Sequence, residues 1–173
     1  MQYIILFFFF GLSYASEAPV FTIDDLNSTE YVLDDGLVVN NAVHFQRIIN
    51  GKTWTNVEST GIAFTFSSDK DGNIEFTWDD ILYNDDIKDS FVVFYKNPKL
   101  GLQWNPDGVE IRIEELNVKS KDLDGEFTTD VYGFYIKGIL STRAWVSRES
   151  GIVRVTRIIN GTERSLVRRK KIR

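Results

Sequence analysis

Closely spaced carboxylates are the groups of this chain whose spacing most resembles a site for chemistry. Calcium needs about six to eight oxygen ligands. Residues 69–73, Asp-Lys-Asp-Gly-Asn, place acids at alternate positions but lack the closing Glu of a helix-loop-helix site, so an ordinary hairpin turn is favoured there. Four other acids lie closer together and form the better calcium candidate: Asp79, Asp80, Asp85 and Asp86. We therefore expect no resident cofactor, with calcium at these four residues as the alternative.

The residue types that catalysis uses most are scarce. The chain has no Cys and a single His, His44, so thiol chemistry and a histidine metal site are excluded. A glycosidase needs two carboxylates across one cleft. Glu110 and Glu114 share a strand face but have Arg112 between them, which is typical of a solvated charge ladder. We therefore expect a protein that is not an enzyme, and a carboxylate-based glycan hydrolase is the weaker alternative.

Two of the four Trp residues, Trp54 and Trp104, lie beside polar or turn residues and are candidates for an exposed ligand-binding surface. Asn50-Gly51 predicts a two-residue type I′ hairpin, in which Arg47 lies directly opposite Trp54. A guanidinium facing an indole across two strands favours a stacked pair. The alternative is that each Trp has no role in binding and packs at the end of the hydrophobic core.

A second hairpin repeats the first, because Arg-Ile-Ile-Asn-Gly recurs at residues 157–161. Here Arg157 lies opposite Arg164. Like charges directly opposite destabilise a strand pair, so either water screens them or an anion lies between them. Arg157 and Arg164 are therefore candidate anion-binding residues, with screening by water as the alternative.

The net charge of −5 conceals an asymmetry along the chain. Residues 143–173 carry ten basic and two acidic residues, a net charge of +8, whereas the remainder has a net charge of −13. We expect residues 168–173 to form a basic tail and Arg168 and Arg169 to join the arginines of the second hairpin in binding a polyanion. A solvated tail and a basic protease site are the alternatives.

The first fifteen residues resemble a secretory signal peptide. A short apolar run ends at Leu12, and Ser13 and Ala15 have the spacing of a cleavage site. The run is too short for a membrane-spanning helix. Sequons at Asn27 and Asn160 agree with export and N-glycosylation. We expect a secreted, extracellular protein without a transmembrane segment and without nucleic-acid binding.

The remaining chain, residues 16–167, is expected to form one β domain. Short alternating apolar runs divided by turn residues predict about eight to ten strands. Residues 91–95 should form a central strand, and residues 127–140 should hold a strand interrupted at Gly133 or Gly138. With Thr65, Glu75 and Thr77 outside, six alternating apolar residues should share one core face: Ile62, Phe64, Phe66, Ile74, Phe76 and Trp78. An antiparallel β-sandwich or jelly roll is favoured, with a closed β-barrel as the alternative.

These observations favour an extracellular binding module over an enzyme. Its partner would be a glycan, a polyanion or a protein surface, recognised through Trp54, Trp104 and the basic hairpin. A carrier with an interior cavity for a small apolar ligand is the main alternative.

Overall fold

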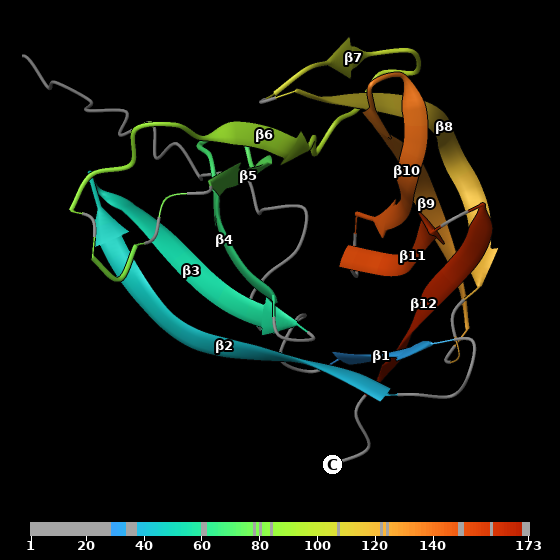
Figure 1. The fold of residues 1–173 in the computed structure, drawn as a ribbon, viewed down its shortest axis with the longest axis horizontal. Helices are drawn as coiled ribbons and strands as arrows, with labels where there is room; N and C mark the ends of the chain where they lie inside the picture. Colours follow the sequence, from blue (N-terminus) through green and yellow to red (C-terminus); the bar gives the residue numbers. More distant parts are fainter. Residues whose placement is uncertain are drawn as a thin grey trace, which may run out of the picture.

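The protein folds into antiparallel β-strands (Figure 1). The computed structural model describes residues 29–33, 38–59, 62–77, 79, 81–83, 85–106, 108–121, 123, 125–148, 151–159 and 161–170. The strands, in chain order, are β1 (Thr29–Leu33), β2 (Val38–Ile49), β3 (Lys52–Ser59), β4 (Ile62–Ser68), β5 (Ile74–Thr77), β6 (Phe91–Phe94), β7 (Gln103–Trp104), β8 (Val109–Lys121), β9 (Glu126–Ile136), β10 (Ile139–Ser147), β11 (Gly151–Ile159) and β12 (Thr162–Lys170). Among the described residues no helix is long and apolar enough to cross a membrane.

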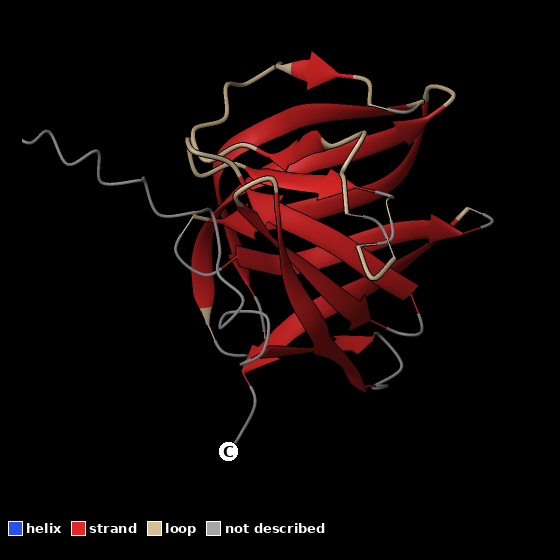
Figure 2. Ribbon diagram, turned by 90° about the vertical axis from the view of Figure 1, so that its left-hand side faces the viewer, coloured by secondary structure: helices blue, strands red, loops and turns tan. Residues whose placement is uncertain are grey.

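The strands follow one another in the order β6-β5-β4-β3-β2-β1-β12-β11-β10-β9-β8-β7. This continuous series of paired strands bends at β1 and β2, so that two antiparallel sheets face each other, as in a β-sandwich (Figures 1 and 2). β6 and β7 are its two edges, so the sheets are not closed into a barrel. The predicted antiparallel β-sandwich is confirmed, and the closed alternative is not what this structure shows.

Tight turns connect most neighbouring strands. Asn50 and Gly51 both have positive φ, 52° and 75°, as a type I′ turn requires, and Ile49 pairs with Lys52. The hairpin predicted here is confirmed. Gly138, with φ 77°, separates β9 from β10, which identifies the interruption expected in residues 127–140.

The larger hydrophobic core lies between the two sheets. Its buried residues come from both: Ile74, Phe94, Ile111, Ile113, Tyr132, Ala144 and Val146. Phe66 packs against this core and pairs with Phe76, so the expected core face is confirmed for Phe66, Ile74 and Phe76. Trp78 and the side chains of Ile62 and Phe64 lie outside what the structure describes. The opposite face is also covered, because Thr77, 2 % exposed, donates to the Asp89 carbonyl at 2.6 Å. The loop between β5 and β6 therefore covers the side that was expected to face solvent.

Residues 91–94 form β6, an edge strand, so their expected position at the centre of a sheet is wrong. Their apolar side chains are needed because the edge is packed against the opposite sheet. Trp104 donates from Nε1 to the Val92 carbonyl at 2.7 Å, and Tyr132 donates from its hydroxyl to the Tyr95 carbonyl at 2.9 Å. Trp104 of β7 and Tyr132 of β9 thus reach across from the opposite sheet and donate hydrogen bonds to backbone carbonyls in β6 and directly after it.

Candidate functional site

Trp54 is 3 % exposed, so the exposed position expected for it is wrong. Arg47 does lie opposite Trp54, as the hairpin register predicted. The loop between β5 and β6 covers the indole: Ile81 is fully buried in the same cluster, and Arg47 donates to the Ile81 carbonyl at 2.7 Å. Arg47 also pairs with Asp85, which holds this loop in place. Sequence periodicity could not show this cover, because the loop reaches Trp54 from more than twenty residues away.

Trp104 is half-buried, and its ring meets Tyr95 edge-on with centroids 5.0 Å apart. Its indole nitrogen is engaged by β6, as described above. Trp104 lies on β7 and Trp54 on β3, each packed in a different cluster. The two residues therefore do not form one exposed aromatic surface, although a role in binding stays a prediction.

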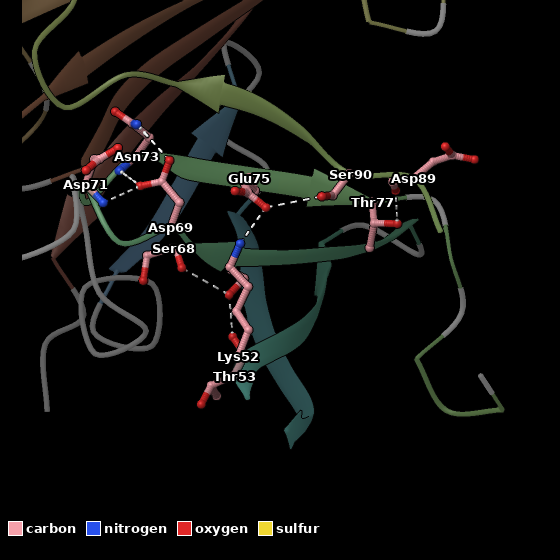
Figure 3. A network of polar contacts seen from close by, with 11 residues as sticks. Lys52, Thr53, Ser68, Asp69, Asp71, Asn73, Glu75, Thr77, Asp89 and Ser90 are labelled. Carbon is pink, nitrogen blue, oxygen red and sulfur yellow. Dashed lines mark hydrogen bonds and ion pairs between the residues drawn. The ribbon is translucent and has the colours of Figure 1, made fainter. Parts of the chain in front are cut away.

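The acidic residues proposed for calcium have protein partners. The carboxylate of Asp69 accepts hydrogen bonds from the backbone of Asp71 and Asn73, both at 2.9 Å, which makes an ordinary hairpin turn (Figure 3). Asp79 accepts from the backbone of Lys88 at 2.8 Å, and Asp86 accepts from the side chain of Asn50 at 2.9 Å.

The described residues contain no group of three or more acids or histidines placed to hold a metal. Asp85 is the acid paired with Arg47, and Asp80 lies outside the described residues. In the described part of the chain, these acids accept hydrogen bonds or form ion pairs that stabilise turns and loops.

A cluster that the sequence did not predict lies on β8, β9 and β10, and we call it the Glu114 cluster: Glu114, Gly133, Tyr135 and Arg143. The carboxylate of Glu114 accepts from Arg143 Nε at 2.5 Å and from the Tyr135 hydroxyl. It lies directly over Gly133, where an added Cβ would come within 2.4 Å of Glu114 Oε1. A glycine within a strand often marks such a close approach, and this was the available signal.

The hydrogen bond to the Glu114 carboxylate is the main cause that raises the pKa of Tyr135. The same carboxylate raises the pKa of Arg143 through its hydrogen bond. On the same sheet, Arg112 stacks over Tyr135 at 4.1 Å from the ring centroid and donates to Glu110 at 2.6 Å. That hydrogen bond lowers the pKa of Glu110. The charged and phenolic side chains on this face of the sheet thus form hydrogen bonds and a cation–π contact with one another.

The pairing of these carboxylates weighs against their use as a hydrolytic pair. A general acid needs a raised pKa, whereas that of Glu110 is lowered. Glu110 and Glu114 are four residues apart on β8, which is about 13 Å along an extended strand and longer than glycosidase pairs span. We interpret both carboxylates as stabilising elements of the sheet.

Arg157 lies directly opposite Arg164, as the second hairpin predicted, and both side chains are exposed. We call these two residues the arginine pair. The register extends to neighbouring strands, because Arg157 also pairs with Thr142, and Thr142 with Phe134. Phe134 packs against the main core, so the arginine pair lies on the core side of the sheet, at its solvent-exposed margin. Two guanidinium groups and a hydroxyl thus share one row across β10, β11 and β12.

Two described basic residues of the C-terminal region lie on a different face from the arginine pair. Arg143 and Arg154 alternate with the arginine pair and lie on the opposite face of the sheet. β12 continues through Lys170, so Arg168 and Arg169 belong to a strand paired with β1 and not to the tail expected from residue 168. Beyond Lys170, the chain lies outside the described residues, as do the signal-like segment, Asn27 and Asn160.

In comparisons with known proteins, no protein-family model, no curated protein and no solved structure matches the chain.

Proposed function

We propose that this protein is a secreted, non-enzymatic recognition module that binds a polyanionic partner through the arginine pair. The observation that carries the proposal is the direct cross-strand pairing of Arg157 with Arg164, both exposed. Like charges at directly opposite positions destabilise a strand pair. An anion between the two guanidinium groups would reverse the sign of that interaction and would form charge-assisted hydrogen bonds with both.

Two features of the strands around the pair support the proposal. Thr142 adds a hydroxyl donor to the row. Glu163 is next to Arg164 in sequence, but strand alternation places it on the opposite face, where it pairs in register with Ile158. Of the described residues in this row, the charged ones are the two arginines, in a chain whose net charge is −5.

Heparin-affinity chromatography at increasing salt tests the proposal. The matched variants are Arg157→Gln/Arg164→Gln and Lys70→Gln/Lys121→Gln, which remove the same charge from different surfaces; the four side chains are exposed. We expect the wild type to be retained at low salt and the arginine variant to elute earlier than the lysine variant. Thermal unfolding of both variants checks that each remains folded. Elution of the wild type without retention, or equal shifts for both variants, refutes the proposal.

A further inference from the structure

A second surface stands beside the arginine pair and is apolar. The turn between β9 and β10, Lys137-Gly138, has φ values of 52° and 77° and is flanked by the cross-strand pair Ile136 and Ile139. Ile136 is 49 % exposed and Ile139 is 72 % exposed. We call these two residues the isoleucine tip. Large aliphatic side chains at the end of a tight hairpin are not needed for its turn, which depends on Lys137 and Gly138.

The isoleucine tip and the arginine pair face the same way. Ile136 is two residues from Phe134 on β9, so both lie on one face, and Phe134 is in the row that leads through Thr142 to Arg157. β10 starts at the tip and pairs with the end of β11, so the β9–β10 and β11–β12 turns lie at the same end of the sheet. Lys137, which is exposed, adds a further positive charge at that end.

We propose that this end of the sheet docks on an anionic phospholipid bilayer, with the isoleucine tip entering the interface and the arginine pair contacting phosphate headgroups. The inference rests on the proposed function and names its polyanion. Apolar side chains beside cations are the composition that interfacial membrane binding requires, because burial of apolar area and attraction to anionic lipid add together. A soluble sulfated glycan satisfies the arginine pair alone and leaves the isoleucines in water.

Sedimentation with vesicles of phosphatidylcholine, with and without about 30 % phosphatidylserine, tests this partner. The isoleucine variant is Ile136→Ser/Ile139→Ser, and its matched control is Ile48→Ser/Leu100→Ser, which removes two exposed aliphatic side chains elsewhere; Ile48 is 75 % and Leu100 is 65 % exposed. We expect the partition coefficient of the isoleucine variant for the vesicles that contain phosphatidylserine to be at least about tenfold lower than that of the wild type. The control variant should match the wild type. The variant Arg157→Gln/Arg164→Gln, which removes the arginine pair, should partition about 25-fold less to the vesicles that contain phosphatidylserine.

Heparin retention separates this inference from the function on which it rests. Unchanged heparin retention of the isoleucine variant, together with its loss of vesicle binding, supports the inference. Heparin retention of a wild type that binds no anionic vesicles refutes the membrane partner and leaves polyanion recognition standing, whereas failure of both refutes both. Vesicle binding that survives removal of the isoleucines also overturns the inference. Because the Asn160 sequon directly follows β11 in the sequence, glycosylated and deglycosylated protein are both assayed, and binding by neither form counts as failure.

Discussion

Replacing Gly133 with Ala should destabilise the protein by displacing Glu114. The new Cβ would come within 2.4 Å of Glu114 Oε1, 2.7 Å of Glu114 Cδ and 2.9 Å of Tyr135 Cε2. The backbone itself accepts alanine, since Gly133 is not among the positive-φ residues. The carboxylate must therefore move, and it is held by Arg143 and Tyr135.

The magnitude follows from the bonds that the displacement breaks. A hydrogen bond to a charged group contributes about 1.5–3 kcal/mol when well buried. The Arg143 side chain is 36 % exposed, so we take the loss of both bonds together as about 2–3 kcal/mol. Replacing Gly by Ala restricts the unfolded chain and returns about 0.4–1 kcal/mol. We expect a net loss of about 1–2.5 kcal/mol, or a melting temperature lower by roughly 3–8 °C.

A double-mutant cycle with Glu114→Ala measures whether the clash with Glu114 is the cause. Urea unfolding, followed by tryptophan fluorescence, gives the free energy of unfolding of the wild type, Gly133→Ala, Glu114→Ala and the double variant. Once Glu114 is truncated, Gly133→Ala should cost clearly less than in the wild type, because only the contact with the Tyr135 ring is left to relieve. An equal cost of Gly133→Ala in both backgrounds would refute the reasoning, because the clash would then lie elsewhere.

Two further predictions concern Tyr135 and Gly51. The raised pKa of Tyr135 favours its neutral form in the folded state, so this contribution to stability is complete below the unfolded pKa of about 10 and is lost as pH rises through the folded pKa. Alkaline absorbance titration of the wild type and of Glu114→Gln should show a lower Tyr135 pKa in the variant. Identical titrations of the two proteins would contradict the assigned cause. Gly51→Ala should cost about 1–2 kcal/mol, because its φ is 75°; the position is surrounded by open space, so no clash adds to this cost. Gly125→Ala, also in open space but without positive φ, should be neutral or stabilising by up to about 1 kcal/mol. Thermal unfolding that shows equal effects of the two substitutions would exclude backbone strain as the difference.

The sequence was sufficient for features determined by neighbouring residues. Asn50-Gly51 predicts its turn through the positive φ that both positions require, and this turn sets the register that places Arg47 opposite Trp54. The same local logic places Arg157 opposite Arg164.

Burial by distant segments could not be predicted in this way. Trp54 is covered by Ile81, and the edge strand β6 is covered by Trp104, because loops and the opposite sheet bring these residues together. The Glu114 cluster depends on three strands and on the missing side chain of Gly133. A single sequence indicates the glycine, but only the pairing of β8 with β9 shows what lies over it.

The strand order also has a consequence for how the chain reaches its fold. β2 to β6 and β7 to β12 are two series of neighbours in sequence, so each can form from local hairpins. β1 joins them, and its pairing with β12 brings Thr29 beside Lys170. During synthesis this joint must wait until the last strand has emerged, while both halves are already able to form. The cationic residues at the end of β12 therefore complete the sheet, and joining its halves closes a loop of about 140 residues between Thr29 and Lys170.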